Sequence, residues 1–172
     1  MKAIRNFGLL YILLVIIQIL ITNYCRFSTL TTVSILPVMI LCLPLSVGTI
    51  PAMFIAFVTG LATDWLSEGI LGLNALALVP VAAVRKPVIL LFLGKDLIER
   101  QEPISIQKNG LAKIFGAIVV LQAVFLAVYI MADGAGVRPF WFNAARFAVS
   151  LAAGAVLSLI VAVTSLVPSG KK

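Results

Sequence analysis

Two carboxylates interrupt the most apolar half of the chain, in the stretch GLATDWLSEGILGLNAL from Gly60 to Leu76. Asp64 and Glu68 are four residues apart, a spacing that puts two side chains on one face of a helix. Such a pair can act as general acid and base, or can carry protons. Catalysis also needs a nucleophile, a metal or a positioned cation, and only the distant Arg138 and Arg146 offer one. We therefore expect no enzyme activity and no catalytic residue.

Metal and cofactor chemistry has little support in the sequence. Histidine is absent, and the two cysteines, Cys25 and Cys42, are far apart and form no CxxC pair. We expect no bound zinc, haem or other cofactor. Cys42 lies in an apolar run and is expected to be a buried free thiol, while one disulfide stays open as an alternative.

The composition is that of a membrane protein. Of 172 residues, 62% are hydrophobic and 11% are charged, and the mean hydropathy is +1.18. These values lie far outside those of a soluble domain. The net charge of +7 comes from dispersed basic residues, so we expect no nucleic-acid partner. The N-terminal run MKAIRNFGLLYILLVIIQIL is predicted to be a retained first span.

Uncharged runs predict a bundle of six transmembrane helices. The longest, Phe27 to Thr63, has 37 residues. As one helix it would be ~55 Å long, against a hydrocarbon core of ~30 Å, so we expect a break at LPLSVGTIP, Leu43 to Pro51. We predict an all-α integral membrane protein with one membrane domain, 1–172. Its expected spans are about 7–23, 31–44, 48–66, 70–90, 111–131 and 141–163, with a cytoplasmic loop at about 91–110.

Two parts of this arrangement stay open. Residues 31–61 fit either two spans or a re-entrant hairpin. Residues 88–100 fit either an interfacial helix or a continuation of the fourth span, in which Arg85 and Lys86 would snorkel.

The distribution of charge predicts the orientation. Ten of the 13 basic residues lie at the N-terminus, between Arg85 and Lys113, or in the C-terminal tail. The positive-inside rule makes these parts, and so both termini, cytoplasmic. Ionisable residues are costly at the midplane, where the polar candidates are Gln18 and Gln122. A coupled transporter acting alone is therefore disfavoured.

Small residues recur at four-residue spacing in two spans and predict close helix packing in lipid. The stripes are Ala52, Ala56 and Gly60, followed by Asp64, in the third span, and Ser150, Gly154 and Ser158 in the sixth, beside a parallel stripe of Ala144, Ala148 and Ala152. Packing within the chain and docking of another protein's membrane helix both fit this pattern.

The segment 64–72 also has a purely structural interpretation. Asp64 or Ser67 can cap exposed backbone amides, and Trp65 can lie at the level of the lipid headgroups. The glycines in this segment permit a tight turn into the fourth span.

Residues 35–86 resemble the core of the bacterial rod shape-determining protein MreD family. The shared elements are a proline at the start of the second span, a small turn, a glycine and an aspartate ending the third span, then a small residue, LG and an ALA-like run. In this chain they are Pro37, Gly48, Gly60, Asp64, Gly69, Leu71, Gly72, Ala75, Leu76 and Ala77.

This resemblance implies a non-enzymatic scaffold subunit of the cell elongation machinery in the bacterial cytoplasmic (inner) membrane. Such a subunit supports lateral peptidoglycan synthesis and cell shape. The implied partners are MreC and, through it, a glycosyltransferase, a transpeptidase and the actin-like MreB filament, with membrane lipid around the helices.

An alternative comes from the same resemblance, because the family is similar in fold to substrate-binding subunits of energy-coupling-factor vitamin transporters. A vitamin-binding subunit needs polar and aromatic side chains that converge at the outer face. The available set is Trp65, Arg138, Trp141, Asn143 and Arg146.

Overall fold

The computed structural model describes residues 2–24, 32–68, 70–99, 104–134 and 139–166, and most of these residues are helical. Within these ranges there is no strand, which confirms the all-α expectation for the described residues. The elements are α1 (Lys2–Tyr24), α2 (Leu36–Leu41), α3 (Thr49–Thr63), the π-helical turn η1 (Asp64–Glu68), α4 (Leu73–Leu93), α5 (Lys95–Glu99), α6 (Ile106–Asn109), α7 (Leu111–Gly134) and α8 (Phe140–Leu166).

Four helical stretches are long and apolar enough to cross a membrane. They are Thr49–Ser67, Leu73–Leu93, Leu111–Gly134 and Phe140–Thr164. A shorter apolar stretch of α1 covers Gly8–Tyr24. Large apolar side chains such as Leu9, Phe54 and Leu91 are exposed on the outside of the bundle. Lipid suits such a surface and water does not, so these helices indicate a membrane-embedded protein.

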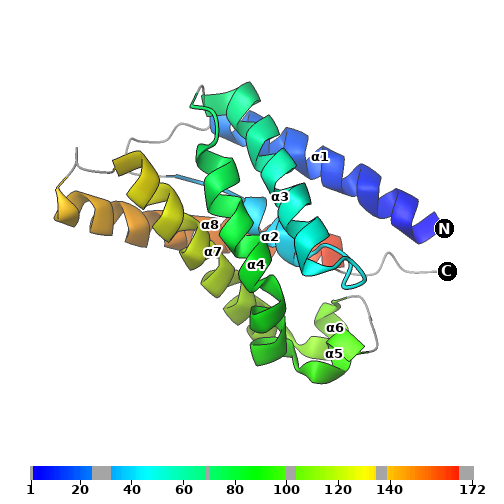
Figure 1. The fold of residues 1–172 in the computed structure, drawn as a ribbon. Helices are drawn as coiled ribbons and strands as arrows, with labels where there is room; N and C mark the ends of the chain where they lie inside the picture. Colours follow the sequence, from blue (N-terminus) through cyan, green and yellow to red (C-terminus); the bar gives the residue numbers. More distant parts are fainter. Residues whose placement is uncertain (1, 25–31, 69, 100–103, 135–138, 167–172) are drawn as a thin grey trace.

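The long helices are packed mainly against their neighbours in the sequence (Figure 1). α3 lies along α4, α4 along α7, and α7 along α8, while α1 contacts α2, α3 and η1. The short α2 lies inside the bundle and contacts α1, α3, α4, α7 and α8. The first residues of α1 and the last turns of α8 lie at the same end of the molecule.

The second expected span, 31–44, differs most from the structure. Only Leu36–Leu41 is helical, and residues 32–35, called the non-helical segment below, precede it. Pro37 stands in the first turn of α2, where its missing N–H is harmless, and so favours a helix start at that point. The chain turns after Cys42, close to Pro44. In place of the single helix expected over 31–44, the structure has the non-helical segment followed by α2. All residues from Ile35 to Leu41 are buried.

Within residues 88–100 the structure continues α4 and then begins a second, short helix. α4 continues through the apolar run to Leu93 and stops at Gly94, whose φ of 94° is in the region that favours glycine. The short α5 follows, with Leu97 buried and Lys95 exposed. The apolar run is thus a continuation of the fourth helix, but Arg85 does not snorkel from it, because its side chain is 1% exposed.

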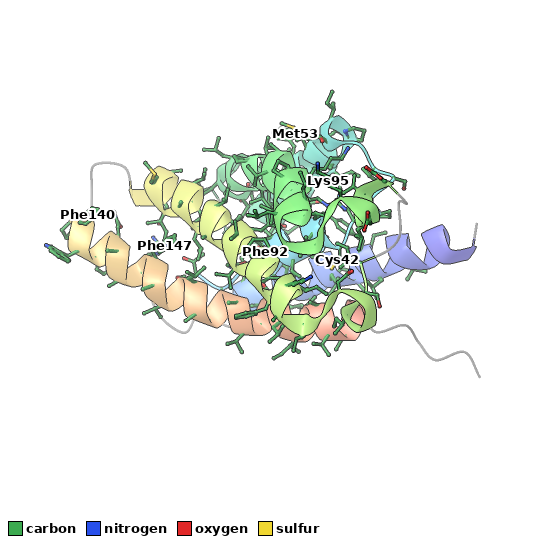
Figure 2. All side chains as sticks on the ribbon, turned by 90° about the horizontal axis from the view of Figure 1, so that it is seen from below. Cys42, Met53, Phe92, Lys95, Phe140 and Phe147 are labelled. Atoms are coloured by element: carbon green, nitrogen blue, oxygen red, sulfur yellow. The ribbon has the colours of Figure 1, made fainter. Side chains whose placement is uncertain are left out.

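The two ends of the bundle have different surfaces. Phe54, Phe57 and Phe115 are also exposed, on α3 and α7, but the four most exposed aromatic residues lie at one end, namely Tyr24, Trp65, Phe140 and Trp141. Figure 2 shows Phe140 at this end, with Cys42 and Lys95 towards the other. The exposed Lys95 and Lys113 belong to the second end. Exposed tryptophan and tyrosine are typical of a membrane–water interface. The exposed lysines give the second end a basic surface.

Candidate functional site

The densest polar network inside the bundle surrounds the non-helical segment. Gln18 on α1 accepts a hydrogen bond from the Ile35 amide at 2.8 Å and donates to the Val33 carbonyl at 3.4 Å. Gln122 on α7 donates to the Ser34 carbonyl at 3.2 Å. Both glutamine side chains are buried. Backbone N–H and C=O groups outside a helix find no hydrogen-bond partner in lipid. The two glutamine side chains supply these partners to the non-helical segment.

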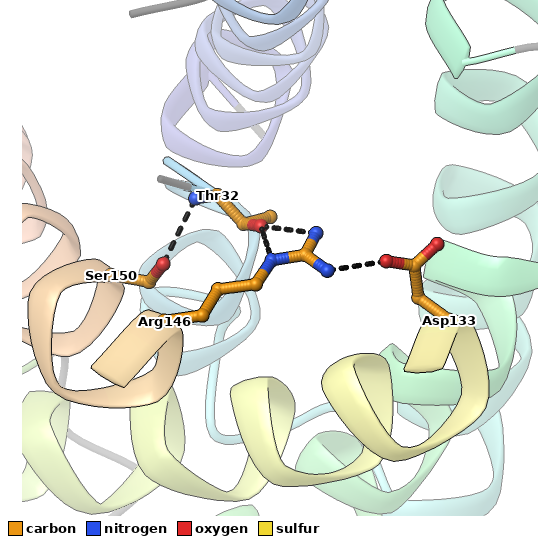
Figure 3. A network of polar contacts seen from close by, with 4 residues as sticks. All are labelled: Thr32, Asp133, Arg146 and Ser150. Carbon is orange, nitrogen blue, oxygen red and sulfur yellow. Dashed lines mark hydrogen bonds and ion pairs between the residues drawn. The ribbon is translucent and has the colours of Figure 1, made fainter. Parts of the chain in front are cut away.

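Arg146 connects the start of the non-helical segment to α7 and α8 (Figure 3). Its guanidinium forms an ion pair with Asp133 and donates to Thr32 Oγ1 from Nε at 3.2 Å and from Nη2 at 2.9 Å. The Thr32 amide donates to Ser150 Oγ at 2.9 Å. The Arg146 Cζ atom also lies 5.9 Å from the centre of the Tyr129 ring. The buried charge is therefore compensated by an ion pair, two hydrogen bonds and an aromatic face.

Arg85 on α4 contacts the chain at the C-terminal end of α2. Its Nη2 atom contacts the carbonyl oxygens of Leu41 and Pro44 at 3.5 and 3.4 Å, and also that of Leu43. These carbonyls lie at the end of α2, where helical hydrogen bonding stops. A buried guanidinium thus acts as a C-terminal cap from a different helix, a role that the sequence analysis did not anticipate.

Asp64 caps the N-terminus of α4. Its Oδ2 atom accepts hydrogen bonds from the amides of Gly72 and Ala75 at 2.9 and 3.3 Å. Its Oδ1 atom accepts from the Asn74 amide at 3.0 Å and from Asn74 Nδ2 at 2.9 Å. Gly72 has a φ of 97°, which brings the chain into this turn. The fully buried carboxylate is stabilised by three backbone donors at the positive end of a helix, as in the structural interpretation of this segment.

Gly60 marks a close approach between α3 and α4. A Cβ atom at this position would lie 2.8 Å from the Asn74 carbonyl carbon and closer still to the Ala75 backbone. Ala52 and Ala56 are buried on the same face of α3. This stripe therefore packs within the chain.

The predicted stripe on α8 is also buried. Ser150 and Ser158 have no exposed surface, and Gly154 lies between them against Gln122, whose Cδ would be 3.0 Å from a Cβ there. Both candidate docking stripes are thus covered by the chain's own helices. The parallel stripe is different, since Ala144, Ala148 and Ala152 are exposed.

Two further motif residues, Pro37 and Gly48, lie at the starts of helices. Pro37 is buried in the first turn of α2, and Gly48 precedes α3 as its N-cap residue. Gly69 and the side chain of Glu68 lie outside the described residues.

The side chains considered for a vitamin pocket do not converge in the described part of the chain. Trp65 and Trp141 are 78% and 82% exposed, and Arg146 is engaged by Asp133 and Thr32. Asn143 lies half-buried against Gly134, and Arg138 is outside the described residues.

No group of three or more acidic, cysteine or histidine residues that could hold a metal occurs among the described residues. Cys42 is a free thiol, and Cys25 lies outside the described ranges. Comparisons with protein families, with curated proteins and with solved structures find no match to this chain. The hydrogen bonds of Gln18, Asp64 and Arg85 are made mainly to backbone groups, at the non-helical segment and at helix ends.

Proposed function

We propose that this protein is a non-enzymatic scaffold subunit of the bacterial cell elongation complex, related to the MreD family, that binds MreC in the cytoplasmic membrane. Three of the residues that carry the resemblance have definite structural roles. Pro37 lies at the start of α2, Asp64 caps α4, and Gly72 lies in the turn before α4. In this proposal the expected second span, about 31–44, is the second of six crossings, and the basic end faces the cytoplasm.

The observation that supports a docking function best is the exposed face of α8. Ala144, Ala148 and Ala152 form a small-residue stretch on it, between the exposed Phe140 and Val156, whereas bulky residues such as Leu9 and Phe54 are exposed on α1 and α3. Small side chains let another helix come close, and van der Waals packing is a main source of helix association in lipid. The membrane helix of MreC is the proposed occupant of this face, and the wall synthases and MreB join through MreC.

The decisive test is gentle purification from the native cell, followed by identification of the co-purifying proteins. The proposal expects MreC and, at lower yield, the elongation glycosyltransferase and transpeptidase. Recovery of an ATPase pair with a coupling subunit, and without MreC, would replace the scaffold by a vitamin-transporter subunit.

A matched pair of variants tests the proposed face. Ala148→Leu puts a bulky side chain on the exposed face of α8, and Ala132→Leu makes the same change at an exposed position of α7. We expect Ala148→Leu to reduce MreC recovery about ten-fold, which corresponds to about 1.4 kcal/mol of lost binding. Ala132→Leu should recover MreC like the unmodified protein, and equal recovery with both variants would exclude α8 as the docking face.

A further inference from the structure

The inner face of α8 meets the non-helical segment along successive helical turns, twice directly and once through Gln122. Arg146 donates to Thr32 Oγ1 from Nε at 3.2 Å and from Nη2 at 2.9 Å, and Ser150 Oγ accepts from the Thr32 amide at 2.9 Å. One turn further, Gly154 lies against Gln122, whose amide donates to a carbonyl of the non-helical segment. Residues four apart share one face of a helix, so these contacts form a single row along α8.

The other contacts of α8 define its rotation less sharply. This helix packs along α7 and contacts α2, and its opposite side is exposed. Helices in lipid associate largely through van der Waals packing, which has little directional preference. Hydrogen bonds need defined distances and angles. The polar row therefore determines the rotation and the axial position of α8 more tightly than the apolar packing does.

The rotation of α8 decides which residues lie on its exposed side. Each alanine of the parallel stripe, Ala144, Ala148 and Ala152, stands two positions before a residue of the polar row. Two positions correspond to about 200° around a helix, so the row and the stripe lie on nearly opposite sides. A rotation by one residue, about 100°, would put the bulkier Val149 where Ala148 now lies.

We propose that the non-helical segment sets the rotation and axial position of α8, with Arg146 and Ser150 as the positioning residues, and so decides which face α8 presents to a partner. For this consequence the inference rests on the proposed function, since the parallel stripe is the proposed docking face. The position of α8 itself can be measured without any partner. Failure to recover MreC would remove the proposed partner and would leave the expected position of α8 unchanged.

Pulsed electron paramagnetic resonance distances, measured on the full-length protein in lipid nanodiscs, test this inference. Nitroxide labels on cysteines introduced at Ala148 on α8 and Leu76 on α4 report the position of α8. Labels at Phe54 on α3 and at Leu76 report the rest of the bundle. All three side chains are exposed, and Cys25→Ser and Cys42→Ser remove the natural thiols.

The double variant Thr32→Val/Ser150→Ala removes the hydrogen bonds from Thr32 to Arg146 and to Ser150 and keeps side chains of similar size. We expect the Ala148–Leu76 distance distribution to become about two-fold wider, while the Phe54–Leu76 distribution stays unchanged.

Two milder variants refine the test. Thr32→Val alone keeps the amide bond to Ser150 and should give a smaller widening, and Thr32→Ser keeps the hydroxyl and should match the unmodified protein. An unchanged Ala148–Leu76 distribution in the double variant would overturn the inference. So would equal widening of both distributions, which indicates a general loosening of the bundle, or equal widening in Thr32→Ser.

Discussion

At the scale of single residues, two of the buried charges, Asp64 and Arg85, act on helix ends. Asp64 is placed at the start of α4, and Arg85 at the end of α2. Each charge meets the backbone groups that a helix terminus leaves unpaired, and the sign of each matches the partial charge of that terminus. Isolated charges become tolerable inside a lipid-embedded bundle in this way.

The Asp64 cap leads to a first prediction. Asp64→Leu leaves three buried amides without their acceptor, so the free energy of unfolding should fall by at least about 2 kcal/mol. Asp64→Asn keeps one side-chain acceptor and should lose about half of that amount. Thermal unfolding in detergent measures both variants. A stability of Asp64→Leu equal to that of the unmodified protein would show that the cap does not stabilise the bundle.

The role of Arg85 can be tested with Cys42 as a local probe, because this thiol lies in the turn that Arg85 holds. Arg85→Met removes the donors from the end of α2, so the turn should open more often. We expect N-ethylmaleimide to modify Cys42 about ten-fold faster, in a Cys25→Ser background that removes the second thiol. Arg85→Lys keeps a donor, so Cys42 in this variant should react at a rate between those of the unmodified protein and of Arg85→Met. An unchanged rate would mean that the carbonyls do not need the guanidinium.

At the scale of elements, the sequence predicts long helices better than it predicts the broken one. The lengths of the uncharged apolar runs predict α3, α4, α7 and α8. The prolines and the glycine between Leu43 and Pro51 predict the turn after α2. The apolar run 31–44 carries no sign that its first half is non-helical. That conformation depends on Gln18 and Gln122, which are distant in sequence, and which the sequence marks as midplane polar residues without indicating their partners.

The contact between α3 and α4 gives a prediction at the element scale. Gly60→Ala introduces a methyl group against rigid backbone of α4, so the helices must move apart, at a cost of about 1–3 kcal/mol. Gly8→Ala is the matched control, because nothing lies within 4 Å of its Cβ position. The control should keep its stability within about 1 kcal/mol or gain slightly from helix propensity. Comparable unfolding temperatures for the two variants would contradict the close approach.

At the scale of the whole molecule, most of the buried polar side chains maintain a single arrangement of helices. The network around the non-helical segment joins α1, α7 and α8, while Asp64 joins α3 to α4, and Arg85 joins α4 to the end of α2. A rigid bundle of this kind can present an outer helix face in a constant position. This property suits the proposed scaffold, whose partner must be held relative to the wall synthases.

The non-helical segment also restricts the order in which the chain can enter the membrane. Its hydrogen-bond partners on α7 and α8 come 88 to 118 residues later in the sequence, so they do not exist when residues 32–41 leave the ribosome. A stretch with unpaired backbone is not stable in hydrocarbon by itself. In nascent chains stalled after residue 110, Cys42 should therefore react with a membrane-impermeant maleimide and should become protected in the full-length protein. Equal protection in both would show that the segment inserts unaided. The non-helical segment would then reach its fully hydrogen-bonded state only after α7 and α8 have been synthesised.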